Sequence, residues 1–295
     1  MNEETNLTHA KMAPSFVHAP GLFRCLPKGE QQKLKLNITY VIKGKAQQTY
    51  KFWGSEPLNA LDLLVLQGLV AIATARFGQH GRKCVVGDGV FQKEGLALEG
   101  GAAFQETMAA RFKLCTLLRH FGYKRPSGDT LIRFRNSIER LSAVTVLITS
   151  SYFRGAYRLL SGYQLDMETG EVVVCLSPKL TAAVLGTKGY LRVDLSEVRR
   201  LKSDAARLIH GRLHWINAGL SGNVGLDALV DYAYGGDGES KRTTRLKREA
   251  AVRKALDELR KLAWTVAETK DKTKNVVFTI SRPLVKTHRR PNGDT

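Results

Sequence analysis

Cysteine is scarce in this chain of 295 residues, which contains only four. Cys25, Cys84, Cys115 and Cys175 stand far apart, and no C-x-x-C pair occurs. Closely spaced cysteines are typical of zinc ribbons and of small disulfide scaffolds. The spacing therefore excludes both classes and favours four reduced thiols in a cytoplasmic protein.

Long hydrophobic runs are also lacking. The most apolar stretch, residues 58–77, is interrupted by Asp62 and leaves only residues 63–75 uncharged, whereas a helix needs about 20 apolar residues to cross a bilayer. The first residues, MNEETNLTHAKMAP, carry acids before any apolar run, unlike a secretory signal. We expect no membrane partner, no export and a cytoplasmic location.

The motifs of nucleotide-driven and metal-dependent catalysis are missing. No G-x-x-x-x-G-K-[ST] occurs, and the glycine-rich stretches lack the strand–turn–helix context of a dinucleotide fold. His210 and His214 lie four residues apart on an expected helix, but no further Cys or His cluster completes a metal site. Tyr232 and Tyr234 would need clustered histidines for a nicking reaction. We therefore interpret the histidines as packed or surface side chains and the tyrosines as core aromatic residues. We predict a protein that is not an enzyme and uses no cofactor or metal.

Acidic residues are outnumbered by basic ones. The chain has 46 Lys plus Arg against 27 Asp plus Glu, which gives a formal net charge of +19. Its 43% hydrophobic and 25% charged residues are those of a folded globular protein. An excess of positive charge is typical of proteins that bind polyanions. Nucleic acid is the leading partner, and the alternative is an ordinary cationic protein whose charge serves solubility.

Periodicity outlines the first half of the chain. Residues 1–18 are interpreted as a loose tail without core residues. Residues 34–53 alternate around a central glycine and predict a β-hairpin, and residues 58–77 predict a buried helix. Residues 78–101 are glycine-rich and are interpreted as an insertion of unassigned role. Residues 107–121 predict an amphipathic helix that ends at Gly122.

A basic helix and a hairpin follow in the first half. Ser127 is a helix-capping residue, and the helix predicted over residues 130–141 carries arginines outside its apolar face. Residues 144–148 and 156–160 then predict two strands joined by a turn. Helix, helix, basic helix and hairpin is the order of a winged helix-turn-helix domain, in which the last helix enters the major groove.

The second half repeats this order. Helices are predicted over residues 203–216, 226–234 and 241–262, and a lysine-bearing hairpin over residues 264–280. The strings ERLSAVTVLI and DELRKLAWTV mark the same helix-to-strand junction about 118 to 120 residues apart. This match favours a duplicated module.

We therefore predict an α+β fold of two tandem winged helix-turn-helix domains. The predicted boundaries are a flexible tail at 1–18, an N-terminal domain at 19–186, a C-terminal domain at 187–285 and a flexible tail at 286–295.

The predicted DNA-binding residues are cations and hydroxyls on the two basic helices and their hairpins. Arginine and lysine reach phosphates or guanine edges, and threonine hydroxyls near a helix start donate to phosphate. Arg245 and Arg248 are expected to matter more than Lys272, because helix residues near a groove can meet base edges whereas hairpin lysines mainly meet phosphate. The three lysines of the second hairpin alternate and are expected to point to one side. The residues are Arg133, Arg135, Arg140, Arg154, Lys241, Arg242, Thr243, Thr244, Arg245, Lys247, Arg248, Lys270, Lys272 and Lys274. Exposed surface charge without a ligand is the alternative for each group.

Five strings carry a family resemblance: APGLFR at 19–24, EPLNALDLLVLQGLVA at 56–71, SIERL at 137–141, YRLLSGY at 157–163 and ARLIHGRLHWI at 206–216. The chain resembles the RepC replication initiators of IncQ-type plasmids over about residues 19–283. The resemblance implies tandem winged-helix domains that bind direct repeats, the iterons, as double-stranded DNA at a plasmid origin and help to open adjacent AT-rich DNA. It also implies a separate plasmid helicase and primase as partners.

Two other functions share features with this prediction. A winged-helix transcriptional repressor would use the same binding surfaces, and an origin-nicking enzyme would need a tyrosine with a metal. Self-association is a further partner hypothesis. The sequence leaves the iteron sequence, the oligomeric state and the manner of strand opening undetermined.

Overall fold

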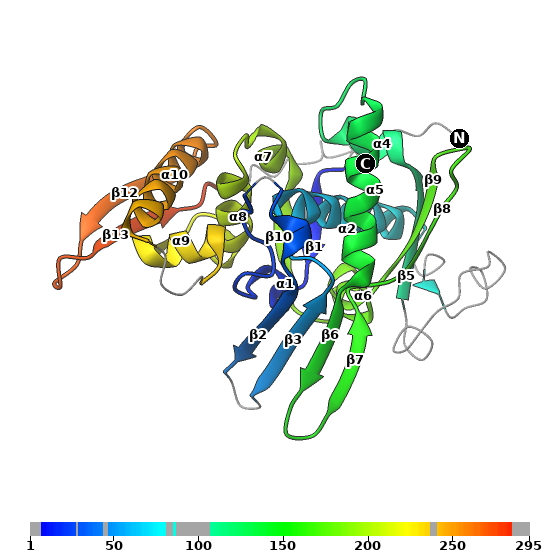
Figure 1. Cartoon of the computed structure of the whole chain (residues 1–295), viewed down its shortest axis with the longest axis horizontal. Helices are drawn as coiled ribbons and strands as arrows, with labels where there is room; N and C mark the ends of the chain where they lie inside the picture. The colour runs from blue at the N-terminus through cyan, green and yellow to red at the C-terminus, as the bar shows by residue number, and fades with distance from the viewer. Residues whose placement is uncertain are drawn as a thin grey trace, which may run out of the picture.

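The computed structural model describes residues 7–27, 29–43, 47–80, 85–86, 107–236 and 241–284. It is a mixed α/β structure with four small antiparallel sheets and helices packed between them (Figure 1). The predicted insertion at 78–101 and the tail at 286–295 fall almost wholly outside these residues.

The N-terminal segment belongs to the core. Strand β1 (His9–Met12) pairs antiparallel with β10 (Leu191–Asp194), and helix α1 (Pro14–Val17) follows it. Met12 and Phe16 are fully buried. The prediction of a loose tail over 1–18 is therefore wrong for residues 7–18, because the partner strand that orders them lies far away in the sequence.

Two hairpins form one four-stranded sheet in the order β2-β3-β6-β7. The strands are β2 (Leu36–Ile42), β3 (Gln48–Gly54), β6 (Thr145–Thr149) and β7 (Arg154–Arg158). Both hairpins were expected from alternation and are confirmed, while the join between β3 and β6 is a long-range pairing. The inner face of the sheet is buried, and the hairpins project side by side from the body in Figure 1.

Helix α2 (Ala60–His80) runs through the core. By length and composition, residues 60–78 could cross a membrane. However, 72% of this apolar stretch is buried inside the protein. Gly68 lies against the helix α4 (Leu114–His120), where an added Cβ would stand 2.7 Å from the Leu117 side chain. The apolar character of α2 therefore reflects its packing inside the protein.

A second four-stranded sheet has the order β4-β5-β9-β8. Its strands are β4 (Val85–Val86), β5 (Thr107–Lys113), β8 (Leu160–Leu165) and β9 (Glu171–Leu176), and the helix α6 (Pro178–Leu185) packs beside it. The helix predicted over 107–121 is thus wrong in its first half. β5 and β9 form a ladder that outweighs the helical pattern of the β5 sequence.

Helix α5 (Gly128–Ala143) is confirmed, and the Ser127 hydroxyl accepts a hydrogen bond from Thr130 N, as expected of a cap. One apolar stripe, with Phe134, Ile138 and Leu141, is buried toward α2. The same helix sends Arg140 toward α2, which makes it part of the core scaffold.

The C-terminal elements surround a second hydrophobic cluster. They comprise α8 (Asp204–Arg212), a 3-10 turn (Leu213–Trp215), β11 (Ser221–Gly225), α9 (Leu226–Tyr234), α10 (Arg242–Arg260), β12 (Thr265–Lys270) and β13 (Val276–Ser281). The preceding helix α7 (Leu195–Arg200) buries Leu195 and Val198 in the first cluster. Helices α8, α9 and α10 contact one another, and the strands form a sheet in the order β11-β13-β12. Trp264 and Phe278 are among the largest buried side chains of this cluster.

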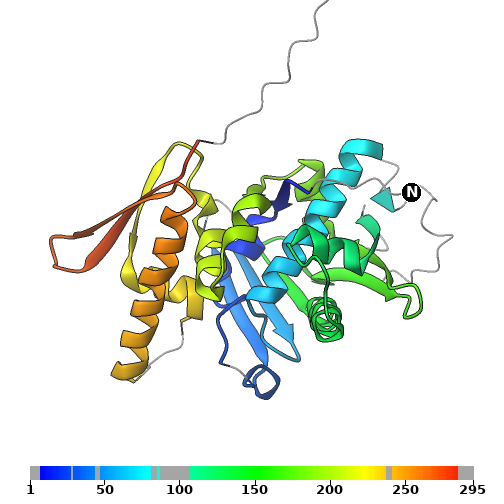
Figure 2. The ribbon, with the colours of Figure 1, turned by 90° about the horizontal axis from the view of Figure 1, so that it is seen from above.

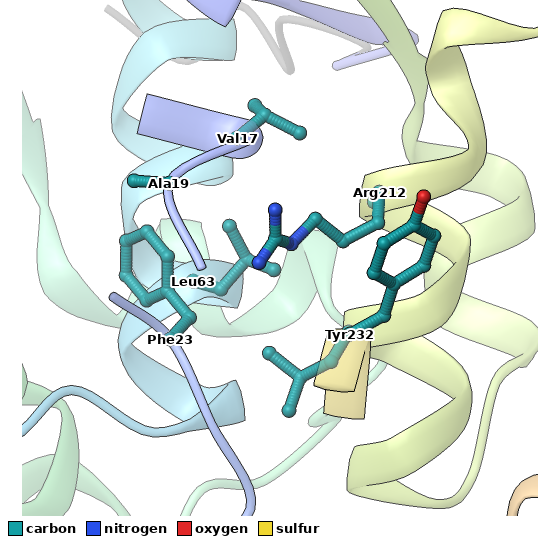
Figure 3. A pocket seen from close by; sticks show the side chains of 8 residues that line it. Val17, Ala19, Phe23, Leu63, Arg212 and Tyr232 are labelled. Atoms are coloured by element: carbon teal, nitrogen blue, oxygen red, sulfur yellow. The ribbon is translucent and has the colours of Figure 1, made fainter. Parts of the chain in front are cut away.

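The two clusters are joined at a small cavity between α2 and α8 (Figure 3). Arg212 reaches from α8 toward Leu63, donates a hydrogen bond to the His18 carbonyl and lies 5.2 Å from the Tyr232 ring centroid. Burial lowers the pKa of Arg212 to about 10, so the guanidinium stays charged at neutral pH. The APGLFR segment lines this cavity with Ala19 and Phe23, and the next residue, Cys25, donates its N–H to Ala233 O at 2.7 Å.

Candidate nucleic-acid interface

Helix α10 is the most cationic described element of the C-terminal part. Val252, Ala255, Leu256 and Leu259 bury the second half of the helix, while its first turns extend beyond the core. Basic residues are concentrated in those first turns, as the sequence predicted. The apolar anchor therefore holds the helix in place and leaves its basic end exposed.

One row of side chains on α10 faces solvent. Thr243, Leu246, Lys247, Ala250 and Lys254 recur at helical spacing and are all exposed. The Leu246 side chain is 56% exposed, although leucine side chains in folded proteins are usually buried. Lys247, like Arg242 on the neighbouring flank, has no hydrogen bond or ion pair within the part of the chain that the structure describes. This row, called here the α10 outer row, is free to contact a ligand.

Arg245 and Arg248 are placed differently from that row. Arg245 Nη2 is 2.7 Å from Asp227 Oδ1, and its Nε is 3.1 Å from Glu249 Oε1. The hydrogen bond to Glu249 and the charge of Asp227 raise the pKa of Arg245. Arg248 lies 4.9 Å from the Tyr234 ring centroid. These arginines are engaged within the protein, so the outer row offers the better contacts.

Three other predicted residues lie at the start of α10. Lys241 is the N-cap residue and is exposed, as are Arg242 and Thr243, whereas Thr244 is half-buried. Thr244 lines a shallow groove with Lys247 and Leu26. The structure thus brings the predicted cations of residues 241–248 together at one helix end.

The hairpin β12–β13 lies at the same end of the molecule as α10 (Figure 2). Asp271 closes its turn by accepting hydrogen bonds from Thr273 N at 2.8 Å and Asn275 N at 2.8 Å. Lys270, Lys272 and Lys274 are all exposed. Only Lys270 is in a strand, and Lys274 has a left-handed φ of 63°. The prediction that the three lysines alternate toward one side is therefore wrong, because two of them belong to the turn.

In the first half, Arg140 forms an ion pair with a carboxylate in the core. Its Nη2 is 2.9 Å from Oδ1 of Asp62, whose side chain is fully buried, while the Arg140 side chain is 16% exposed. Ser137 Oγ donates to the same oxygen at 2.6 Å. The prediction of Arg140 as an exposed surface arginine is corrected, since the partner stands 78 residues away in the sequence.

The remaining arginines of the first half are dispersed. Arg133 is exposed on α5, but Asp129 and Glu139 are exposed on the same helix. Arg135 is half-buried, and Arg154 is exposed at the start of β7. Helix α5 therefore presents mixed charge, unlike the basic end of α10.

A buried histidine cluster lies in the C-terminal part. Glu197, His210 and His214 offer ligand atoms within 4.8 Å of one another. His210 Nε2 is 2.7 Å from Glu197 Oε2, and the Trp264 ring packs against both imidazoles. Burial, followed by the charge of His210, lowers the pKa of His214 well below its usual range. The sequence predicted packed or surface histidines, and the structure places both in the core.

Sequence reasoning missed Leu246, Ala250 and Lys254 as members of the α10 outer row. The basic run itself covers only residues 241–248. Helical spacing from Thr243 and Lys247, however, reaches Ala250 and Lys254 directly. Leu246 carried a separate signal, because it interrupts a basic run away from the buried stripe.

Comparison with known proteins gives one family and one fold. The family model described as Replication protein C (RepC) matches residues 4–284. Two solved structures of domains 2 and 3 of RctB are similar in fold. One has a TM-score of 0.59 at 11% identity and covers 92% of this chain and 99% of its own. The other has a TM-score of 0.54 at 12% identity, with 92% and 97% covered. No curated protein sequence matches the chain.

Proposed function

The chain belongs to the replication protein C (RepC) family, and on that premise we propose that it initiates plasmid replication by binding direct repeats at an origin as double-stranded DNA. The proposal includes the iterons and the opening of adjacent AT-rich DNA that the family resemblance implies. The protein acts through binding and DNA deformation, without nucleotide hydrolysis of its own.

The observation that carries this proposal is the exposed basic end of α10. In a winged helix-turn-helix domain, three helices and a three-stranded sheet place the last helix in the major groove, with the hairpin on the flanking backbone. The order α8, β11, α9, α10, β12 and β13 supports that assignment for the C-terminal part. In the first half, α5 and the hairpin β6–β7 have the same local order within a larger sheet.

The α10 outer row supplies chemistry for reading bases. Lys247 is suited to guanine O6 and N7, and Thr243 to a base edge or a phosphate. Leu246 and Ala250 are apolar, and the thymine methyl group is the apolar feature of the major groove. We assign phosphate contacts to Lys241, Arg242 and the hairpin lysines, since phosphate contacts position a protein without reading sequence.

Footprinting on the parent replicon tests the proposal. Evenly spaced protection over direct repeats is the expected result, whereas protection of one palindrome over a promoter would favour a winged-helix repressor. With supercoiled origin DNA and a divalent metal, a nicked product would instead indicate an origin-nicking enzyme.

Opening of the duplex needs its own test. Bending a 20–30 bp site costs on the order of 1–6 kcal/mol, so we expect several bound molecules and negative supercoiling to act together. Permanganate reactivity of thymines beside the repeats should appear without ATP on supercoiled DNA. Opening that requires ATP, or that occurs equally with one repeat, would contradict this mechanism. A plasmid helicase and primase are the proposed partners that act next, and self-association on adjacent repeats is proposed with them.

A further inference from the structure

The outer face of the β2-β3-β6-β7 sheet is an uncovered surface in the first half of the molecule. Side chains of paired residues on neighbouring strands share a face. Trp53 pairs with Thr145, which pairs with Arg158, and Lys51 pairs with Leu147. Trp53, Lys51 and Arg158 are exposed. The opposite face is buried against the core, so one side of the sheet is anchored and the other is open.

All charged residues at the strand positions of this face are positive. The face is completed near the hairpin ends by the row Val41–Thr49–Thr149–Arg154. Lys51, Arg154 and Arg158 are its charged residues, and no acid stands at any of the described strand positions on it. The remaining positions are threonine, asparagine and apolar residues. The charged strand positions of this face are therefore all cationic, which makes the face complementary to a polyanion.

The tip of the hairpin β6–β7 exposes two aromatic side chains, of which Phe153 lies over Gly155, a position on the opposite side of the sheet. Tyr152 is 91% exposed and Phe153 is 58% exposed. Because these rings are exposed at a hairpin tip, they contribute little hydrophobic burial to folding. Aromatic side chains in folded proteins normally lie in the core or in an interface. The tip is therefore better explained by a ligand than by folding stability.

The tip is also held in one conformation. Ser150 N donates to Phe153 O at 2.8 Å, and the Ser150 hydroxyl accepts from Phe153 N at 3.1 Å. The Phe153 ring covers Gly155, where an added Cβ would lie 2.4 Å from the ring. Glycine at 155 is thus needed for the ring position. A fixed turn presents Tyr152 at little entropic cost on binding.

We propose that this sheet face and its aromatic tip bind single-stranded DNA by stacking unpaired bases on Trp53 and Tyr152, with phosphates at Lys51, Arg154 and Arg158. Sequence-tolerant single-strand binding combines a cationic track with aromatic rings in this way. The Trp53 row and the row at the hairpin end are four residues apart, roughly 13 Å along the strands. A strand of several nucleotides spans that distance.

This inference rests on the proposed function for its biological meaning, because an opened origin supplies the single strand. A duplex bound through α10 and a displaced strand held on the sheet would use separate surfaces of one molecule. Capture of the strand would then favour the open state by mass action.

The experiment measures binding of full-length protein to two probes, an oligo-dT of about 15 nucleotides and a duplex carrying the repeats. Tyr152→Ala and Trp53→Ala should each weaken oligo-dT binding about tenfold, since a base–aromatic stack is lost. Both should leave duplex affinity within about twofold. Lys247→Ala should show the reverse pattern.

Tyr190→Ala is the matched control, because Tyr190 is an exposed aromatic residue on another part of the surface. It should change neither affinity. Tyr152→Ala is the variant least able to disturb folding, given the exposure of its ring. Unchanged oligo-dT binding in Tyr152→Ala and Trp53→Ala would overturn the proposal, and so would an equal loss for both probes.

A shift from dimer to monomer in these variants, without loss of oligo-dT binding, would assign the face to self-association and also overturn the proposal. The single-strand surface and the iteron function fail separately. Tyr152-dependent binding of oligo-dT without repeat-specific duplex binding would support the single-strand surface and contradict the iteron function.

Discussion

The two basic helices, α5 and α10, each precede a β-hairpin, yet their arginines serve different purposes. On α5, Arg140 pairs with the fully buried Asp62, and the exposed surface mixes acids with Arg133. On α10, the apolar anchor lies in the second half and the cations lie beyond it. The same local pattern thus builds a core scaffold in one half and the proposed binding surface in the other.

Cationic residues on a helix therefore indicate a binding surface only where no acidic partner within the protein neutralises them. A buried carboxylate on another element forms an ion pair with such a cation, and exposed acids one turn away also neutralise it. The strings EPLNALD and SIERL, which carry part of the family resemblance, meet in the Asp62, Ser137 and Arg140 contacts. Their resemblance therefore reflects the scaffold of the fold, and the reading surface lies elsewhere.

The largest effect is expected at the buried pair. Arg140→Leu leaves the Asp62 carboxylate without its cation, so the free energy of unfolding should fall by about 3–5 kcal/mol. Arg133→Leu, on the exposed face of the same helix, is the control and should change it by less than about 0.5 kcal/mol. Urea unfolding measures both. Equal values for the two variants would break the distinction between scaffold and surface on α5.

The next effect concerns duplex binding. Replacing Lys241, Arg242 and Lys247 together by alanine should weaken binding to the repeats about 100-fold or more, since each contact contributes about 1–3 kcal/mol. The matched variant replaces Lys124, Arg125 and Arg133, which are exposed near the start of α5. It lowers the net charge equally, and fluorescence anisotropy compares the two. A similar loss in both variants would mean that net charge alone determines the affinity.

A smaller effect is expected at the hairpin turn. Lys272→Ala should reduce the slope of log affinity against log salt by about 1, because one phosphate contact is lost. The preference among repeat sequences should stay unchanged. Titrations at several salt concentrations give the slope, and an altered base preference would show that the turn reads sequence.

The smallest effect is expected for Arg245. Because Asp227 and Glu249 already pair with it, Arg245→Ala should weaken duplex binding by less than about threefold, within the range of an exposed ion pair. Lys247→Ala provides the comparison on the same helix. A larger loss for Arg245 than for Lys247 would show that Arg245 leaves its carboxylates to contact DNA.

Several regular elements of the fold were predictable from sequence. Helix α9 and the hairpins β2–β3, β6–β7 and β12–β13 follow from periodicity and turn residues. Strand β5 did not, because its alanine-rich sequence suits a helix and only the pairing with β9 makes it a strand. Strand β1 was missed for the same reason, since β10 orders it from the other end of the chain.

The candidate site was predictable in place and less so in detail. The basic run at 241–248 lies at one exposed helix end, as its sequence predicted, but the run gave no sign that Arg245 lies between two acids. An ion pair such as Asp62 with Arg140 depends on tertiary contacts that no local pattern records. The period-two alternation of each strand predicts that Trp53, Lys51 and Arg154 lie on the outer face. The pairing of β3 with β6 is needed to bring them onto one sheet.

One measurement tests the contrast between α5 and α10 most directly. A photo-crosslinking amino acid is placed at Ala250, on the α10 outer row, or at Asn136, on the exposed face of α5. With repeat DNA bound, position 250 should crosslink to bases within one repeat, and position 136 should give no specific product. Crosslinks from position 136 that equal or exceed those from position 250 would contradict the assignment of α10 as the duplex-reading helix.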